Sequence, residues 1–334
     1  GDKVLFLCYN RMLCEKLIED HKNNESKAYR KQFENVDFMT ISRLAKKATG
    51  DFRNYDCLYE WLLECIDKKH ELGYKHIIVD EGQDFYADHL QILQEIAESQ
   101  DGCFYVFYDK NQFVQGQEYP EWLDHTECRL VLSHNCRNTH EIALTSTRPI
   151  DVPEKRIKMN PFMDRSEQPK PTLFFVPNND ALQEYVLSLI RKYSDAKYKK
   201  SDIVLLSLKA EGMSALEREH LIPELAAICS DKKQPNKVLF TTVRKFKGLE
   251  ADVVICIDVD ETTFSDETNR NLFYVGSSRA KTWLDILTTT SQESLASAIT
   301  GEDVPRKRPQ AVKIVRDALC VRVGSQSDLV SQES

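Results

Sequence analysis

The chain has 334 residues, of which 41% are hydrophobic, and its formal net charge is −8. A chain of this length can bury more than one hydrophobic core, so about two domains are expected. Its longest apolar runs are far shorter than the ~20 residues that span a bilayer, and no secretory signal is present, which excludes a membrane partner and favours a cytoplasmic protein. The negative charge argues against a generally basic coat for nucleic acid, but it is compatible with a local basic groove.

The ten cysteines include no C-x-x-C pair, and several lie inside apolar runs. This distribution predicts reduced, buried thiols and disfavours a zinc site.

The first half of the chain alternates short apolar runs with amphipathic segments. Short continuous apolar runs bounded by polar residues are typical of buried parallel strands. Strands are expected at 4–9, 37–41, around 77 and at 103–108, and helices at 12–21, 42–47 with Ser42 as the cap, 58–69 and 88–99. This alternation predicts a doubly wound, mostly parallel sheet.

The same alternation resumes after a weakly patterned stretch from 146 to 171. Strands are expected at 172–176, 203–206, 238–242, 253–257 and 283–287, with a helix at 180–193. The expected fold class is therefore α/β with two parallel-sheet units. The Ser- and Gln-rich tail from Ser325 is expected to be disordered.

An apolar run at 76–79 ends abruptly in Asp80 and Glu81, followed by Gly82, Gln83 and Asp84. Open α/β sheets bind ligands at the carboxyl ends of their strands. There, one carboxylate can hold Mg²⁺ while its neighbour accepts a proton from an attacking water. Two acids at a strand end are more often a solvated turn, but the Gly-Gln-Asp that follows makes the functional interpretation stronger.

Four further segments place polar residues where an element ends. Gln112 follows the next strand, and a side-chain amide there can bind a terminal phosphate and lose it on hydrolysis. Arg137 and Arg279 each lie at an element junction, where a guanidinium can stabilise charge on a transferring phosphoryl group. Thr242 and the basic residues after it can contact a nucleic-acid backbone. Ordinary turns and surface ion pairs are the alternatives for each segment taken alone.

Seven segments, in chain order, resemble motifs Ia, Ic, II, III, IV, V and VI of superfamily 1 helicases of the UvrD/Rep/PcrA type. They are residues 9–10, 40–42, 80–84, 108–112, 135–139, 242–250 and 274–281. The resemblance implies two RecA-like domains of the P-loop NTPase type, with ATP and Mg²⁺ as cofactors and single-stranded DNA, or a single-strand/duplex junction, as partner. It implies an ATP-dependent DNA helicase or translocase that couples ATP hydrolysis between the two domains to movement along the strand.

The resemblance also implies roles for individual residues. By this resemblance, Asp80 and Glu81 form the Mg²⁺ site, and Glu81 is also the general base. Gln83 and Gln112 are the residues that sense the γ-phosphate. Arg137 and Arg279 become the two arginine fingers. The remaining matched positions are Glu250 near the nucleotide ribose and phosphate, and Tyr9, Asn10, Thr40, Thr242 and Arg244 along single-stranded DNA.

The expected domains follow from the motif order. The rest of the first RecA-like domain, with motifs Ia to IV, is expected at 1–145, a linker at 146–170, the second RecA-like domain at 171–300 and a C-terminal extension at 301–334. A phosphate loop of the form GxxxxGK[ST] is absent from the sequence. The first domain is therefore expected to lack its N-terminal strand and phosphate loop, and this chain to be an inactive fragment of a longer ATPase.

Two alternatives stay open. The chain can be a catalytically inactive, helicase-like nucleic-acid-binding module, or an unrelated α/β protein with acidic turns. A nuclease activity finds little support within this sequence, so a nuclease would be a fused or partner domain outside it.

Overall fold

The structure, a computed structural model, describes residues 1–68, 72–110, 112, 120–126, 128–160, 169–302 and 308–329. It divides into two compact units, Gly1–Leu130 and Val131–Ser334. The sequence placed the first boundary at residue 145, but α6 (His140–Thr147) packs against α10 (Glu267–Ser277) and β12 (Ala280–Thr288) of the second unit. The apolar side chains of α6 are buried there, which is why the division falls earlier in the chain.

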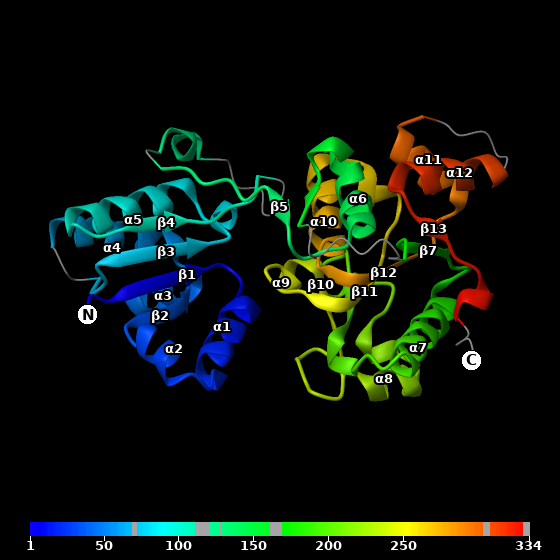
Figure 1. Ribbon diagram of the computed structural model, residues 1–334, viewed down its shortest axis with the longest axis horizontal. Coiled ribbons are helices and arrows are strands. Elements are labelled where there is room, and N and C mark those ends of the chain that lie inside the picture. The colour runs from blue at the N-terminus through cyan, green and yellow to red at the C-terminus, as the bar shows by residue number, and fades with distance from the viewer. Residues whose placement is uncertain are drawn as a thin grey trace. The chain divides into compact units, whose positions relative to one another are not determined.

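The first unit is built on a four-stranded parallel sheet with the strand order β2-β1-β3-β4 (Figure 1). Its strands are β1 (Val4–Cys8), β2 (Val36–Thr40), β3 (His76–Asp80) and β4 (Phe104–Val106). Its helices are α1 (Arg11–Asn23), α2 (Lys27–Gln32), α3 (Ile41–Thr49), α4 (Tyr55–Asp67) and α5 (Ala87–Ser99), with the short 3-10 helices η1 (Gly82–Asp84) and η2 (Glu121–His125).

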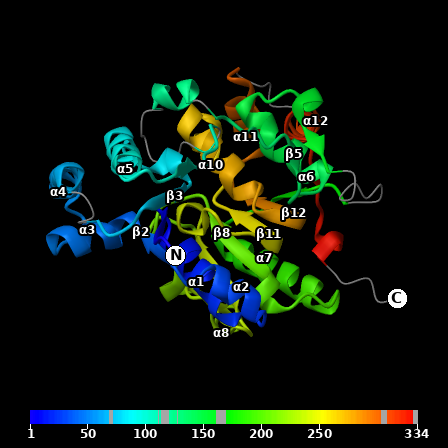
Figure 2. The same ribbon diagram turned by 60° about the vertical axis from the view of Figure 1, so that its left-hand side comes forward.

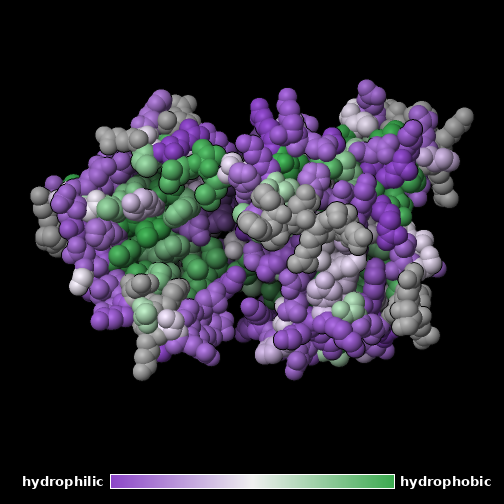
Figure 3. All heavy atoms as spheres, viewed as in Figure 1, coloured by the Kyte–Doolittle hydropathy of each residue, from purple (hydrophilic) through white to green (hydrophobic). Residues whose placement is uncertain are grey.

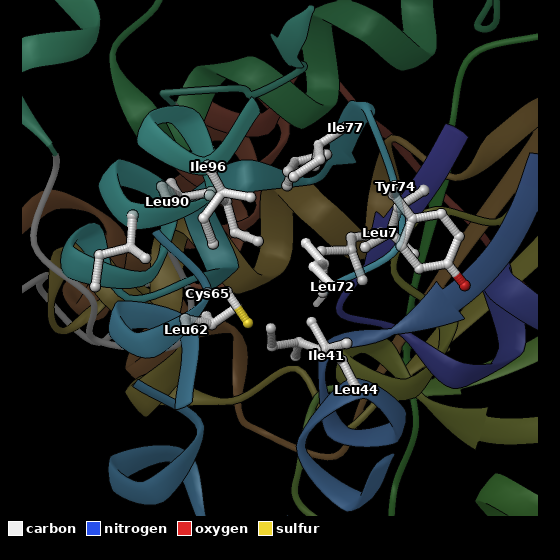
Figure 4. Close-up of a cluster of buried hydrophobic side chains, with 14 of the residues drawn as sticks. Leu7, Ile41, Leu44, Leu62, Cys65, Leu72, Tyr74, Ile77, Leu90 and Ile96 are labelled. Carbon is white, nitrogen blue, oxygen red and sulfur yellow. The ribbon is translucent and has the colours of Figure 1, made fainter. Parts of the chain in front are cut away.

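One face of this sheet carries the core of the first unit. Side chains alternate across a strand, so Leu5 and Leu7 of β1 point to the same side as Ile77 and Val79 of β3, and all four are fully buried. Figure 4 shows side chains of α3, α4 and α5 packed toward these strands. Complete burial of each such side chain contributes roughly 1.5–3 kcal/mol, which fixes the helices on this face.

The opposite face of the same sheet is less completely covered. Phe6 and Ile78, which alternate with the buried residues, are only half-buried, and Tyr105 on β4 is 58% exposed. Figure 3 shows hydrophobic residues gathered over β1, β3 and β4. Parallel sheets are usually buried on both faces, so this apolar surface is unusual for the fold class.

The second unit is built on a seven-stranded parallel sheet with the order β13-β7-β12-β11-β8-β10-β9. The strands besides β12 are β7 (Thr172–Phe175), β8 (Ile203–Ser207), β9 (Cys229–Ser230), β10 (Val238–Thr242), β11 (Ala251–Ile257) and β13 (Arg322–Val323). Helices α7 (Asn179–Asp195) and α8 (Pro223–Ile228) cover one face, and α6 and α10 the other (Figures 1 and 2). The remaining elements are α9 (Val243–Phe246), α11 (Gln292–Thr300), α12 (Arg308–Leu319), the 3-10 helices η3 (Arg148–Ile150), η4 (Glu154–Arg156), η5 (Lys200–Asp202), η6 (Arg218–His220), η7 (Glu261–Phe264) and η8 (Gln326–Leu329), and the short pair β5 (His134–Asn135) and β6 (Lys158–Met159). The predicted α/β class with parallel sheets is confirmed.

A buried carboxyl group lies inside this second sheet. Asp285 of β12 is 2% exposed and accepts a hydrogen bond of 2.5 Å from the hydroxyl of Tyr193 on α7. Burial raises the pKa of Asp285 to about 6, although the hydrogen bond from Tyr193 works in the opposite direction. The charged form of Asp285 is therefore costly at neutral pH.

Several local expectations need correction. Thr40, not Ser42, caps α3, because the Thr40 hydroxyl accepts the backbone N–H of Arg43 and Ser42 bonds elsewhere. The tail forms η8 where disorder was expected, since Asp328 pairs with Arg322; residues 330–334 lie outside the described part. Four cysteines are exposed rather than buried, at positions 57, 103, 128 and 136. No helix in the described ranges is both long and apolar enough to cross a membrane.

Candidate functional site

The predicted acid pair lies at the carboxyl edge of the first sheet. Asp80 is the last residue of β3 and is in register with Cys8, the last residue of β1. Glu81 adopts left-handed backbone angles, with φ 54° and ψ 45°, and its N–H donates to Oδ1 of Asp80 at 2.9 Å. A left-handed glutamate is uncommon, and such conformations concentrate at functional sites.

A chain of hydrogen bonds joins this acid pair to the loop after β4. Nε2 of Gln83 donates to Oε2 of Glu81 at 2.6 Å, and Oε1 of Gln83 accepts the backbone N–H of Asp109 at 3.2 Å. Gln112 then donates to the carboxylate of Asp109 at 2.8 Å. Gln83 and Gln112 are buried, so these hydrogen bonds hold both side chains in one orientation. The structure thus joins Asp80, Glu81, Gln83 and Gln112. It adds Asp109, for which the sequence signal was its place in the polar segment that follows the strand expected at 103–108.

Gly82 allows the two loops to approach this closely. Its N–H donates to the carbonyl of Phe107 at 2.8 Å, and a Cβ at position 82 would lie 2.4 Å from Cγ1 of Val106. We therefore expect Gly82→Ala to lower the free energy of unfolding by about 1–3 kcal/mol through overpacking. Urea unfolding followed by circular dichroism measures this. Adding Val106→Ala removes the clashing methyl groups and should recover part of the loss, so an equal loss in both backgrounds would contradict the explanation.

Asp80 and Glu81 are the residues that could hold a metal ion. Mg²⁺ keeps several waters and is usually bound by one or two carboxylates together with substrate phosphates. Two adjacent carboxylates at a strand end fit that pattern. A site built entirely from protein does not occur in the described ranges, where no group of three or more His, Cys, Asp or Glu residues is arranged to hold a metal.

The residues predicted to track DNA in the first unit lie at the same sheet edge. Oδ1 of Asn10 accepts the N–H groups of Met12 and Leu13, at 2.8 and 3.2 Å, and so caps α1, as Thr40 caps α3. Tyr9 is half-buried with its ring edge-on to Phe85, and burial raises the pKa of its phenol. Each cap contributes about 1 kcal/mol to its helix, so these side chains have a structural role whatever they bind.

In the second unit, Glu250 joins two cations. Nε of Arg137 and Nζ of Lys281 each lie 2.9 Å from its carboxylate oxygens. Burial opposes ionisation of Glu250, but the hydrogen bonds from Lys281 and Arg137 outweigh it and hold its pKa below the ordinary value. Lys281 had no assigned role in the sequence, although it lies in a matched segment. Arginine and lysine side chains are the groups that bind phosphate in many proteins. Here the anion that they bind is the carboxylate of Glu250.

Two asparagines fix Arg137 in the second unit. Oδ1 of Asn135 accepts the backbone N–H of Arg137, and Nδ2 of Asn138 donates to the carbonyls of Ser278 and Ala280, at 2.8 and 2.5 Å. Asn138 is 4% exposed, so these bonds are shielded from water. The assignment of Arg137 to a first domain at 1–145 therefore does not describe this structure.

Arg279 lies in the core of the second unit. It is 1% exposed, and its Nε donates to the carbonyl of Val275 at 2.9 Å. Its own carbonyl accepts the N–H of Ala251 at the start of β11. Arg279 thus ties the end of α10 to the sheet, and its role as an arginine finger stays a prediction.

Thr242 has the same position in the second unit as Thr40 in the first, because each ends a strand and caps the helix that follows. It ends β10 and its hydroxyl caps α9 by accepting the N–H of Lys245 at 3.3 Å. Arg244 is partly exposed on α9, whereas Lys247 is 1% exposed. Lys247 is one of the basic residues after Thr242 that the sequence assigns to a nucleic-acid backbone, but its side chain is buried, which is unusual for a lysine.

Comparison with known proteins identifies the segment that carries these residues. A solved structure, the C-terminal domain of a possible DNA helicase from Lactobacillus plantarum WCFS1, is 20% identical with a TM-score of 0.34, covering 46% of this chain and 86% of that one. No curated protein matches the chain. Residues 237–287, from β10 into β12, match the family model of the UvrD-like helicase C-terminal domain. This part of the chain, which contains Thr242, Arg244, Glu250, Arg279 and Lys281, is therefore similar to the C-terminal domain of UvrD-like helicases.

Proposed function

We propose that this chain forms part of an ATP-dependent DNA helicase or translocase of the UvrD-like type, which moves along single-stranded DNA. The observation that carries the proposal is the family match over residues 237–287. The hydrogen-bonded chain from Asp80 to Gln112 supports it, because acids and amides meet at the sheet edge where α/β folds bind ligands.

In this proposal the first unit performs the hydrolytic step. Asp80 holds Mg²⁺, which when bound neutralises charge on the nucleotide phosphates. Glu81 accepts the proton of the attacking water, and Gln83 keeps the Glu81 carboxylate oriented. Gln112, held by Asp109, donates to the terminal phosphate and loses that partner after hydrolysis.

In the second unit, Arg137 exchanges partners. Its guanidinium pairs with Glu250 at 2.9 Å. A phosphate group competes with that carboxylate for the same donors, and Lys281 keeps Glu250 neutralised when Arg137 leaves. Nucleotide binding would in this way be coupled to a rearrangement of the Glu250 cluster.

The proposed motor also requires a phosphate loop, which the sequence lacks. The incompletely covered face of the first sheet, where Phe6 and Ile78 are half-buried, supports an additional strand and helix that carry the loop. We infer that ATP turnover depends on such an element from a longer form of the protein.

The test uses the full chain and fluorescein-labelled oligo(dT) in fluorescence anisotropy, with duplex DNA for comparison. We expect preferential binding of the single strand, with log K falling linearly against log salt at a slope of about −0.7 per neutralised phosphate. Absence of single-strand binding would overturn the proposed function. Robust ATP hydrolysis by this chain alone would overturn the requirement for a separate phosphate loop.

A second candidate is a helicase-like nucleic-acid-binding module without turnover. The burial of Arg279 favours it, because a guanidinium that secures the core has less freedom to reach a phosphate. This candidate predicts that Mg-ATP leaves oligo(dT) affinity unchanged, whereas the motor predicts a nucleotide-dependent change once the phosphate loop is present.

A further inference from the structure

An aromatic cluster lies at the N-terminal ends of α3, α4 and α5, close to the Thr40 cap. The hydroxyls of Ser42 and Tyr55 are 2.8 Å apart, and a ring nitrogen of His89 lies 3.1 Å from the carbonyl of Tyr55. The ring of Tyr86 lies over His89 with centroids 5.4 Å apart and planes tilted by 37°, and its centroid is 5.9 Å from that of Tyr55. These contacts hold the three rings in one arrangement.

Exposure within this cluster is uneven. Tyr86 is 46% exposed, whereas His89 beneath it is 6% exposed. Burial lowers the pKa of His89, so this ring is neutral at physiological pH and supports Tyr86 as an aromatic surface. A large aromatic ring that is rigidly supported on one side and open on the other can bind a planar ligand with little loss of side-chain entropy.

Cationic side chains occur in the segments that carry these rings, as do Asp56 and Asp88, whose charges act on His89. Phe52, three residues before Tyr55, is 48% exposed and has Nζ of Lys46 4.3 Å from its ring centroid. Arg43 and Arg53 are exposed; Arg43 directly follows Ser42 in the chain, and Arg53 precedes Tyr55 by two residues. Exposed aromatic rings among cations are the combination that binds single-stranded nucleic acid, through base stacking and backbone neutralisation. Sequence reasoning missed these aromatic residues because they lie outside the matched segments.

We propose that Tyr86, supported by His89 and Tyr55, stacks on an unpaired base of single-stranded nucleic acid whose backbone is contacted by Arg43 and Lys46. The positive charge of these side chains favours a polyanion over an uncharged peptide as the occupant. This inference rests on the proposed function and adds residues that bind the bases rather than the backbone.

The test compares Tyr86→Ala with Tyr86→Phe in the full chain. Base–aromatic stacking corresponds to about a 5- to 150-fold change in affinity on alanine substitution, so Tyr86→Ala should weaken oligo(dT) binding by that factor. Tyr86→Phe keeps the ring and should stay within about twofold of the unsubstituted chain. Tyr105→Ala, at a similarly exposed tyrosine on β4, is the matched control and should leave affinity unchanged.

A second probe separates stacking from charge. An oligomer with the same backbone but abasic nucleotides should bind the unsubstituted chain and Tyr86→Ala equally. The ratio of the oligo(dT) affinities of these two proteins should also stay the same when added salt lowers both affinities. Tyr86→Leu keeps an apolar side chain over His89 but removes the aromatic ring, so it should bind oligo(dT) as weakly as Tyr86→Ala. A thermal melt of each variant shows whether it is folded.

Three outcomes would overturn the inference. Unchanged oligo(dT) affinity in Tyr86→Ala and Tyr86→Leu would exclude the stacking role and leave the proposed function intact. An equal loss on the abasic oligomer would show that Tyr86 acts on the backbone or on the fold. Failure of the unsubstituted chain to bind oligo(dT) would remove the proposed function and this inference together.

Discussion

Glu81→Gln, in a form of this protein that hydrolyses ATP, is expected to lower kcat by about 10²–10⁴-fold while leaving affinity for oligo(dT) unchanged. The amide cannot accept a proton from water at neutral pH, but its oxygen can still accept the hydrogen bond that Gln83 donates to Glu81. The substitution therefore removes the base with little change in shape. Steady-state phosphate release, stimulated by single-stranded DNA, measures the loss.

The matched control is Glu95→Gln on α5. Glu95 also accepts a hydrogen bond from a glutamine amide, that of Gln91, but on the exposed surface of the helix. This control should retain full turnover. Turnover by Glu81→Gln close to that of Glu95→Gln would remove Glu81 from the role of general base.

Asp285→Asn is expected to stabilise the second unit at pH 8, by up to about 3 kcal/mol. The pKa of Asp285 is about 6 in the folded protein and 3.8 for an ordinary aspartate, and this difference sets the magnitude. Below about pH 4 the carboxyl is protonated in both states and stability is not reduced. As pH rises through 6 the folded state must hold a buried carboxylate, so stability is lost, and asparagine avoids that loss. The gain should fall to about half at pH 5.

Urea unfolding at pH 5 and pH 8 measures this difference. Trp283 lies two residues before Asp285 in β12, so replacing Trp61 and Trp122 by phenylalanine makes tryptophan fluorescence specific for the second unit. Tyr193→Phe removes the hydroxyl that donates to Asp285 and should cost about 1.5–3 kcal/mol at pH 8, because a buried charge loses its donor. The cost should be smaller at pH 5 and in the Asp285→Asn background. Equal effects of Asp285→Asn at both pH values would contradict the raised pKa.

Much of the local structure follows from short-range pattern. The apolar runs ending at Cys8, Asp80 and Thr242 become the parallel strands β1, β3 and β10, because a run of that length is buried most completely in the middle of a sheet. Asp80, Glu81 and Gln83 could be proposed as neighbours for the same reason, since residues just after a strand stay at its carboxyl edge.

The position of Arg137 could not be inferred in this way. Its partner Glu250 is 113 residues away, and Asn138 reaches backbone carbonyls about 140 residues distant. Motif order places Arg137 after the first sheet but does not say which core takes up the segment. Packing of α6 against α10 and β12 decides that in favour of the second unit.

The sequence by itself determined the α/β class, the strands and the acids and amides at their carboxyl ends, because each depends on residues close together in the chain. Only the tertiary structure decided that Arg137 belongs with Glu250, that Arg279 is in the core, and that Ser42, Tyr55 and His89 support an exposed Tyr86. These contacts join residues far apart in sequence, so each depends on how the elements of its own unit pack around that unit's sheet.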